Sequence, residues 1–593
     1  MRTSLLLLLA ALLGCEGRAR TGASGGATHE ESRSGPAVAV LDLSDSLPEI
    51  PSTGVLGLSS KGGSFDALVR EVERLHHAKK TLGVLVRLGT ARIGLARATE
   101  AGALLEQLGA EMPVWCHADD LSNGTLYLAA RACKRVWLSP AGSVDAIGLA
   151  LQNIYFHKLL AEQLGLEVDF LQIGKYKGAE EPFTRDGPSP EARESLQSTL
   201  VGMRAGWLQG ILHARPGLAA ATPEDGPYDA RDAKALGLID EVGYFDDARD
   251  AIEEQTGAKR GEVRFGGGTG GGGDDLSDVL RAVVGESLES APVALVRADG
   301  AISMEGGGGP FGGGGIVERK LSRTLNRLAQ DDDVKAVVLR IDSPGGSALA
   351  SDLLWHELMK IRADKPLVVS VGGMAASGGY YMASTGSVIF ADETSIVGSI
   401  GVVGGKVSAD RALERLGVHA ETFAANPGDP GAAARATYES LLSPWDEATR
   451  ARLRTTMEGI YKLFLDRVAE GRRMPVERVE ASAQGRIFCG RDGLTRGLVD
   501  EIGGLEEAIA RARSMAGLAP DARVAVAGEP SGLLEVLTDD GSPDSAAKSV
   551  TSAAERVALG RLAADLGPFV DSVMPLLDHE RALCAVPFGI VVR

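Results

Sequence analysis

Residues 366–384 read PLVVSVGGMAASGGYYMAS. The aliphatic and β-branched run after Pro366 predicts a buried strand, the glycines predict a turn, and the apolar segment after Ser377 predicts a helix. A serine in such a turn lies at a helix N-terminus, where the neighbouring backbone N–H groups are free to bind an oxyanion. Ser377 is therefore a candidate nucleophile. The alternative is a serine that only caps the helix.

A second glycine turn lies upstream, at the end of KAVVLRIDSPGGS (335–347). This pattern predicts another buried strand, and glycines that follow a parallel strand can present a backbone N–H group to a ligand. Two such strand ends can form the two halves of an oxyanion hole. Gly346 and Gly378 are the candidate donors.

Three motifs, LRIDSPGGS, GGMAASGGYYMAS and VGSIGVVGG, occur in this order along the chain. Together they resemble the catalytic half of the signal peptide peptidase A (protease IV) family, in its long two-repeat form, within the ClpP/crotonase superfamily. The resemblance implies an α/β fold of two tandem ClpP/crotonase-like domains. It further implies a serine peptidase of the Ser/Lys type that needs no cofactor, degrades cleaved signal peptides and other extended apolar peptides, and assembles as a homotetramer at a membrane.

The sequence contains an internal duplication. The apolar helical face of residues 68–75 and the strand GVLVRL after it recur 253 residues later, in residues 321–328 and the strand AVVLRI. Further on, GLIDEVG (237–243) recurs as GLVDEIG (497–503). Because so many landmarks keep the same order and nearly the same offset, we interpret the two segments as copies of one α/β unit.

The copies and the segments around them define the expected domain organisation. It consists of a lipoprotein-type signal peptide (1–15), a tether (16–36), a first crotonase-like repeat (37–258), a glycine-rich linker (259–290), a second crotonase-like repeat (291–518) and a C-terminal extension without an assigned role (519–593). Residues 306–315, GGGGPFGGGG, are expected to form a surface loop. Leucines at 559, 562 and 566 recur at helical spacing and predict a packing helix in the extension.

The two repeats differ where the chemistry is expected. Residues 90–93 replace the SPGG turn, and Asn123 takes the place of Ser377, so the first repeat has neither a nucleophile nor an oxyanion hole. The first repeat does contain IGKYKGAEEPFTRDGPSP (173–190), whose counterpart in the second repeat has no lysine. Each repeat lacks what the other one has, which predicts a single site shared by both.

A serine hydroxyl needs a base to become a nucleophile at neutral pH. Histidine-based members of the resembled superfamily place their base some two dozen residues after the serine, but this chain has no histidine between His356 and His419. The resemblance implies that Lys177, in the YKGAEEPF stretch of the first repeat, is the general base. Lys175 and Lys406 remain alternatives.

A lysine that accepts a proton must be neutral, so its pKa has to fall from about 10.4 towards 7 or 8. Burial between the two repeats would lower it in this way. Ser399, in VGSIG, is expected to orient the amine by a hydrogen bond, as the matching serine does in the resembled family. The repeat aligns it with Ala146, which again leaves the polar group only in the second copy. The alternative is an ordinary turn serine.

The N-terminus predicts export. Arg2 precedes an apolar run from Leu5 to Leu13 that is too short to span the hydrocarbon core of a membrane as a helix. The run ends in Leu-Leu-Gly-Cys, which resembles a bacterial lipoprotein signal and implies cleavage before Cys15 and lipidation of its thiol. The protein is then expected on the periplasmic side of the bacterial cell envelope, anchored to a membrane. An ordinary signal peptide with an incidental cysteine is the alternative.

Composition excludes several classes of function. A net charge of −18, with no basic stripe interleaved with aromatic residues, argues against nucleic acid as a partner. The five cysteines show no CxxC motif and no metal-ligand spacing, so no metal site is expected, and nothing in their positions demands pairing. Two rival functions remain: a catalytically inactive lipoprotein scaffold and a crotonase-like acyl-CoA enzyme. The complementary motifs disfavour the scaffold, and the export signal disfavours the acyl-CoA enzyme.

Overall fold

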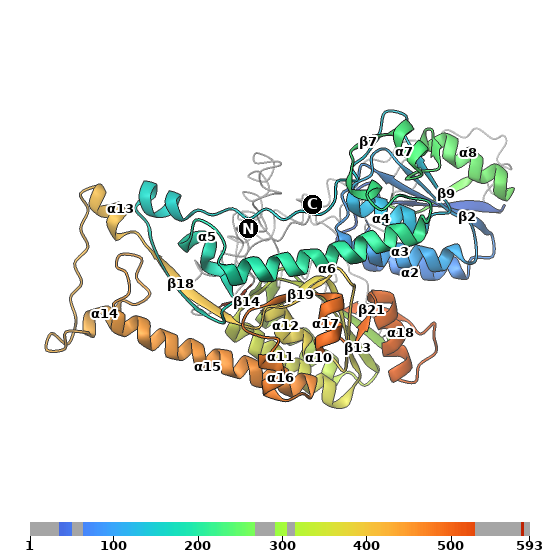
Figure 1. The fold of residues 1–593 in the computed structure, drawn as a ribbon. Coiled ribbons are helices and arrows are strands. Elements are labelled where there is room, and N and C mark those ends of the chain that lie inside the picture. The colour runs from blue at the N-terminus through green and yellow to red at the C-terminus, as the bar shows by residue number, and fades with distance from the viewer. Residues whose placement is uncertain (1–34, 50–62, 267–290, 305–314, 528–582, 586–593) are drawn as a thin grey trace, which may run out of the picture.

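The computed structural model describes residues 35–49, 63–266, 291–304, 315–527 and 583–585. Two α/β bodies, an N-terminal unit and a C-terminal unit, lie against each other (Figure 1). Three sequence predictions fall outside the described residues: the lipidation site Cys15, the tail helix expected around residues 559–566, and all but the last residue of the 306–315 loop. No described helix is long and apolar enough to cross a membrane.

The N-terminal unit is built on a parallel sheet with the strand order β9-β1-β2-β3-β4-β8. Its strands are β1 (Ala37–Asp42), β2 (Thr81–Gly89), β3 (Val114–Ala118), β4 (Arg135–Leu138), β8 (Glu241–Val242) and β9 (Gly261–Phe265). The helices packed around it are α2 (Phe65–His76), α3 (Leu95–Gly109), α4 (Asn123–Ala132), α6 (Pro190–Ala214), α7 (Ala230–Leu236) and α8 (Phe245–Thr256).

The C-terminal unit repeats this plan, with the order β21-β10-β13-β15-β16-β20. Its strands are β10 (Val293–Asp299), β13 (Ala336–Ser343), β15 (Leu367–Ala376), β16 (Val388–Ala391), β20 (Glu501–Ile502) and β21 (Val524–Ala527). The corresponding helices are α10 (Glu318–Gln330), α11 (Ala348–Asp364), α12 (Gly378–Ala383), α15 (Glu447–Arg472), α17 (Gly490–Arg496) and α18 (Leu505–Met515), with α16 (Val476–Glu480) after α15. The same strand order in both sheets confirms the predicted tandem α/β architecture.

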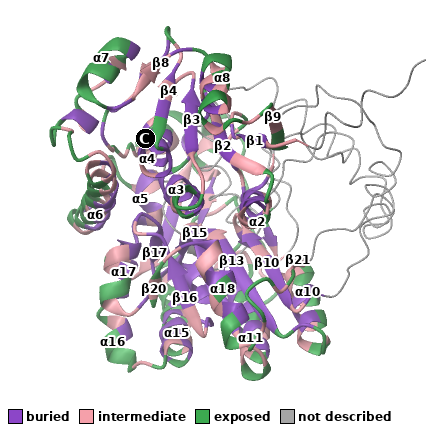
Figure 2. Cartoon of the chain, turned by 90° about the vertical axis from the view of Figure 1, so that its right-hand side faces the viewer, coloured by how far each residue is buried: buried purple, intermediate pink, exposed green. Residues whose placement is uncertain are grey.

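The burial of these strands explains their composition. Parallel strands covered by helices on both faces read as continuous β-branched and aliphatic runs, and the residues of β13 are buried from Ala336 to Ile341. In Figure 2 the strands of both sheets are drawn mostly as buried. The helical face predicted at residues 68–75 is buried in α2, where Leu68, Val72 and Leu75 are fully enclosed.

Each unit ends with a strand that the sequence analysis assigned to a neighbouring segment. β9 lies in the predicted linker and pairs with β1, while β21 lies in the predicted extension and pairs with β10. Each of these two strands is only four or five residues long. In the sequence they do not stand out from the glycine-rich or polar residues around them, so the repeats extend further than expected.

A smaller sheet joins the two units, in the order β12-β11-β14-β22-β18-β6. Its strands are β12 (Ile316–Val317), β11 (Ile302–Ser303), β14 (Gly345–Ser347), β22 (Leu583–Ala585), β18 (Val402–Ser408) and β6 (Glu167–Ile173). β6 belongs to the N-terminal unit and pairs antiparallel with β18 of the C-terminal unit along its whole length. Two further antiparallel pairs are present. β5 (Ser143–Val144) and β7 (Tyr228–Asp229) form a separate two-stranded sheet, whereas β17 (Ile396–Gly398) pairs with β19 (Ile487–Cys489) and also with β15 of the main C-terminal sheet.

An arm extends from the body at the far end of β6 and β18 (Figure 1). We define the arm as residues 158–166 and 409–446, which include the π-helix η2 (Leu159–Leu164), α13 (Asp410–Arg415) and α14 (Ala432–Ala436). Arg415 Nη1 donates hydrogen bonds to the carbonyl oxygens of residues 162 and 163, which hold the two parts of the arm together. Large apolar side chains on the arm are exposed, with Phe423 at 84% and Leu416 at 77%.

A buried charge network joins the two units at the seam between them. Arg340, from β13, donates to Glu49 Oε1 at 2.9 Å, to Glu100 Oε1 at 2.8 Å and to Ser370 Oγ at 2.7 Å. Burial would raise the pKa of Glu49, but Arg340 and Arg97 lower it to about 2. Since Glu49 and Glu100 belong to the N-terminal unit, removing the Arg340 guanidinium would leave both carboxylates buried without this partner.

One disulfide lies within the N-terminal unit. Cys116, in β3, is bonded to Cys133, at the C-terminal end of α4. The cysteine positions alone did not indicate this pair, because the two residues meet only when the strand and the helix pack together. Cys489 is a buried free thiol.

Candidate active site

Ser377 lies where β15 ends and α12 begins. Its backbone has φ 55° and ψ −113°, a conformation that residues other than glycine seldom adopt. Its N–H donates to the carbonyl oxygen of Gly398 at 2.7 Å, which fixes the turn. Close packing makes glycine necessary nearby, since a Cβ on Gly379 would come within 2.7 Å of the Ser343 carbonyl oxygen. The turn thus presents the serine at the N-terminal end of a helix, as the sequence predicted.

Lys177 lies in the turn that follows β6, and the C-terminal unit holds this turn in place. The N–H of Tyr176 donates to the carbonyl oxygen of Gln484 at 2.8 Å. Gly485 has φ 80°, and a Cβ built there would lie 2.5 Å from the Cβ of Lys177. The backbone of residues 484 and 485 therefore supports the lysine directly. The sequence analysis missed Gly485, although a glycine in a short loop between a helix and a strand can indicate a close approach of another backbone.

The side chains of Lys177, Ser377 and Ser399 meet. Lys177 Nζ lies 2.7 Å from Ser377 Oγ, 2.9 Å from the carbonyl oxygen of Ser399 and 3.0 Å from Ser399 Oγ. All three residues have 0% exposure. Ser399 also has a positive φ, of 55°, and its N–H donates to the carbonyl oxygen of Arg486 at 2.7 Å. The structure thus brings together the residues that the sequence singled out in two different repeats.

This geometry allows a neutral amine. A neutral lysine has two N–H groups and one lone pair, whereas an ammonium ion has three donors and no acceptor. The two N–H groups can donate to the carbonyl and hydroxyl oxygens of Ser399, which leaves the lone pair to accept the hydroxyl proton of Ser377. Burial away from water disfavours the charged form of such a group.

Glu180, the carboxyl group nearest to Lys177 in the sequence, is compatible with a neutral amine. Burial, with the nearby charge of Glu181 as a smaller cause, raises the pKa of Glu180 to about 8. The raised pKa disfavours the charged carboxylate that would stabilise an ammonium ion. Glu181 instead accepts a hydrogen bond from the N–H of Ser189 at 3.0 Å, which fixes the start of α6.

The two alternative lysines lie elsewhere. Lys175 is exposed, and its Nζ lies 4.9 Å from the centre of the Tyr176 ring. Lys406 donates to the carbonyl oxygen of Ser440 at 3.0 Å and lies 5.8 Å from the centre of the Trp445 ring. Of the three candidate bases, Lys177 is the one in hydrogen-bond contact with the candidate nucleophile.

The two glycines proposed as oxyanion donors flank the serine on neighbouring elements. Gly378 is the first residue of α12, so its N–H has no acceptor within the helix. Gly346 lies in β14, which contacts α12 and is opposite Ile302 on one side and Cys584 on the other. A Cβ at Gly346 would lie 2.1 Å from the Ile302 carbonyl oxygen, so only glycine fits there.

The equivalent place in the N-terminal unit holds no such constellation. Asn123 begins α4 and donates to the carbonyl oxygen of Gly148 at 2.8 Å, and Ala146 is fully buried. Among the described residues, no group of His, Cys, Asp and Glu side chains is arranged to hold a metal ion.

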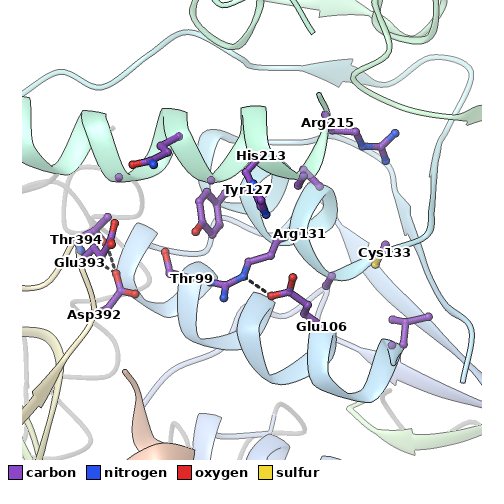
Figure 3. Close-up of a pocket in the computed structure, with 18 of the residues that line it drawn as sticks. Thr99, Glu106, Tyr127, Arg131, Cys133, His213, Arg215, Asp392, Glu393 and Thr394 are labelled. Atoms are coloured by element: carbon purple, nitrogen blue, oxygen red, sulfur yellow. Dashed lines mark hydrogen bonds and ion pairs between the residues drawn. The ribbon is translucent and has the colours of Figure 1, made fainter. Parts of the chain in front are cut away.

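A cavity of about 910 Å³ lies between the units, but neither Lys177 nor Ser377 lines it. Figure 3 shows its walls, which come from α3, α4 and α6 and from residues 392–394 of the C-terminal unit. Side chains of both charges line it, and Arg131 Nε donates to Glu106 Oε2 at 2.8 Å. Its polar lining of both signs does not resemble the apolar groove expected for the substrate.

Comparison with known proteins places the chain in a peptidase family. Peptidase family S49 matches residues 106–259 and 360–519, one segment in each unit. The chain is 31% identical to Protease 4 of Salmonella typhi over 81% of this chain and 78% of that protein, and 31% identical to Protease 4 of Haemophilus influenzae over 71% and 68%. It is also 31% identical to the chloroplastic serine protease SPPA of Arabidopsis thaliana, over 66% of this chain and 57% of that protein.

Among solved structures, a ClpP1 mutant from Listeria monocytogenes matches 36% of this chain at 12% identity and a TM-score of 0.23, which is too low to support an argument. The family match, in contrast, covers more than half of the chain and includes the serine turn. The chain therefore belongs to peptidase family S49 and is a serine peptidase.

Proposed function

We propose that this protein is a membrane-anchored endopeptidase with a Ser/Lys dyad that degrades extended apolar peptides, including signal peptides released from their precursors. The observation that carries the proposal is the 2.7 Å contact between Lys177 Nζ and Ser377 Oγ, in a site closed to solvent and shared by the two units.

In the proposed mechanism, Ser377 Oγ attacks the peptide carbonyl carbon while Lys177 Nζ takes the hydroxyl proton. The N–H groups of Gly346 and Gly378 stabilise the oxyanion that forms. Lys177 then gives the proton to the departing amine, and water hydrolyses the acyl-enzyme by the same steps. Ser399 acts as a positioning residue, because its two oxygens hold the amine in place.

The preference for extended peptides rests on the small sheet. β14 and β18 are separated in the strand order by a single strand, so about 10 Å lies between their backbones. β22 occupies that slot in the structure, and an extended peptide that replaced it could form backbone hydrogen bonds on both sides, which gives affinity without regard to sequence. Apolar side chains line the slot at Phe170 and Val403, with Phe183 beside them, and favour apolar residues in the peptide.

The location and assembly are part of the proposal. A lipid on Cys15 would anchor the chain on the periplasmic side of the cell envelope, and the Cys116–Cys133 disulfide is consistent with an oxidising compartment. The exposed apolar side chains of the arm suit contact with further copies of the chain, in line with a homotetramer.

The test is hydrolysis of a fluorogenic apolar peptide by the purified chain without its signal peptide, compared with Ser377→Ala and Lys177→Ala. Loss of activity in both variants supports the dyad. Activity that survives Lys177→Ala would assign the base to another residue, and no activity in the unmodified chain would contradict the proposal.

A further inference from the structure

A second, smaller cavity lies beside the cavity of about 910 Å³ at the seam between the two units. We call it the inner cavity, and its volume is about 140 Å³. Its walls come from α2 and α3 of the N-terminal unit and from residues 502–507, where β20 ends and α18 begins. Neither Lys177 nor Ser377 lines it, so it is separate from the proposed active site. The two cavities share the lining residues Thr99, Arg131, Asp392 and Ile502.

The inner cavity is acidic. The described residues that line it include four carboxyl groups and one cationic side chain, namely Glu100, Asp392, Glu506, Glu507 and Arg131. Two of the carboxyl groups have partners, since Glu100 accepts from Arg340 at 2.8 Å and Glu507 accepts from the backbone N–H just before α18 at 2.9 Å. Figure 3 shows the guanidinium of Arg131 directed to Glu106, to which it donates at 2.8 Å. The remaining two carboxyl groups, Asp392 and Glu506, face the cavity from the C-terminal unit.

Asp392 is buried and has one carboxyl oxygen unused. The residue is only 4% exposed. Its Oδ1 accepts hydrogen bonds from the N–H and the hydroxyl of Thr394 at 2.8 and 2.6 Å, whereas its Oδ2 accepts none from the part of the chain that the structure describes. Burial raises the pKa of Asp392 to about 7, and the nearby charges of Glu100 and Glu393 raise it as well. The chain thus supplies no cation to this carboxyl group.

Glu506 presents a second unused oxygen. Its Oε2 is buried and has no hydrogen-bond partner among the described residues, and burial raises its pKa to about 7. A buried carboxylate is costly unless hydrogen-bond donors or a cation compensate it. A protonated primary amine offers both, because it carries a positive charge and three N–H donors.

We propose that the inner cavity binds a protonated primary amine at the end of an unbranched molecule, with the ammonium group against Asp392 and Glu506 and the rest of the molecule in the larger cavity. A volume of about 140 Å³ equals that of about four to five water molecules, enough for the ammonium group and a few carbon atoms. Polyamines and the free N-termini of short peptides, which a peptidase releases, both carry this group. Because the walls come from both units, the bound amine stabilises their packing.

The test is calorimetric titration of the Ser377→Ala chain, in which the proposed nucleophile is absent, with spermidine, trialanine and N-acetyl-trialanine. The last probe has no free amine. In the same background, Asp392→Asn removes the charge but keeps an oxygen to which Thr394 can donate. Glu506→Gln removes the second carboxyl group. Glu254→Gln is the matched control, because this exposed carboxylate of α8 lines neither cavity.

At least one of the two amines is expected to bind the parent with a Kd below about 1 mM. Asp392→Asn should weaken that binding by at least about tenfold, because the ammonium group loses a charged partner. Glu254→Gln should bind within about twofold of the parent. The bound amine should also raise the Tm of the parent but not that of Asp392→Asn.

The proposal is overturned if neither amine binds below this limit, or if Asp392→Asn and Glu254→Gln bind the amines equally tightly. Binding of spermidine alone identifies a polyamine as the ligand, and binding of trialanine that is lost on acetylation identifies a peptide N-terminus. Thermal unfolding shows whether each variant is folded, and Glu506→Gln decides the outcome if Asp392→Asn is not.

Discussion

Replacing Lys177 with methionine should abolish hydrolysis in a chain that remains folded. Methionine keeps the length and the apolar stem but removes the Nζ atom that lies 2.7 Å from Ser377 Oγ. Without this base the hydroxyl proton must go to water, and removing the partner of an activated nucleophile costs several orders of magnitude in rate. We expect kcat/KM to fall by at least about 10³-fold, which corresponds to about 4 kcal/mol of transition-state stabilisation.

The same change should not lower the free energy of unfolding. Lys177 has 0% exposure, and burying an amine costs free energy that only its hydrogen bonds offset. Methionine removes that cost and loses three contacts, one to Ser377 and two to Ser399, each worth about 1 kcal/mol. We therefore expect the free energy of unfolding to stay the same or to rise by about 1 kcal/mol, as is common when a catalytic group is replaced.

The measurement is kcat/KM on a fluorogenic apolar peptide from pH 6 to 9, together with urea unfolding of the same samples. Lys175→Met is the matched control, because this lysine is two residues away and exposed. It should retain activity within about twofold. The reasoning is refuted if Lys177→Met keeps more than a tenth of the activity, or if Lys175→Met loses as much.

Four further changes test other parts of the structure. Ser399→Ala should lower kcat by about 10- to 100-fold with little change in KM, because the amine loses one of the contacts that orient it. Gly485→Ala should reduce kcat by more than about 100-fold, since the new Cβ would displace the backbone under the base; circular dichroism should show a folded chain. Glu180→Gln should flatten the pH dependence of stability. The Glu180 carboxyl binds its proton more tightly in the folded chain, so it adds to the free energy of unfolding at low pH. This contribution is complete below the unfolded pKa near 4.5, and about 3 to 5 kcal/mol of it is lost as the pH rises to about 8. The same pH dependence of the free energy of unfolding in the variant and the parent, measured by urea unfolding, would contradict this. Cys133→Ser should cost about 3 kcal/mol of stability for a crosslink between residues 17 apart, and added reductant should then have no further effect.

Sequence reasoning reached the tandem architecture because the duplication leaves matched landmarks at a nearly constant offset. The serine turn was also predictable, since a strand, paired glycines and an apolar helix carry local signals that need no tertiary information. Local sequence signals did not decide between Lys177 and Lys175. Two residues of separation in an extended stretch put both on the same side, so only the resemblance to a family decided between them. The structure distinguishes them through the turn after β6, which directs one side chain inwards and leaves the other in solvent.

Features that depend on distant contacts were not predictable. Gly485 supports the lysine from a loop more than 300 residues later in the chain, and nothing local indicates which backbone it approaches. The Cys116–Cys133 disulfide joins a strand to the end of a helix and requires their packing to be known. The short terminal strands β9 and β21 gain their stability from pairing with β1 and β10, because runs of four or five residues have little preference of their own.

The division of the site between two units makes activity depend on how the units fit together. Lys177 reaches Ser377 because β6 is paired with β18 along its length and because the backbone at Gly485 supports the turn that follows. Arg340 also joins the two units, through Glu49 and Glu100. A chain whose units separated by even about 1 Å would keep both folds but lose the contact between the proposed base and the proposed nucleophile. In the proposed mechanism neither unit carries the active site alone, because the lysine and the serine come from different copies.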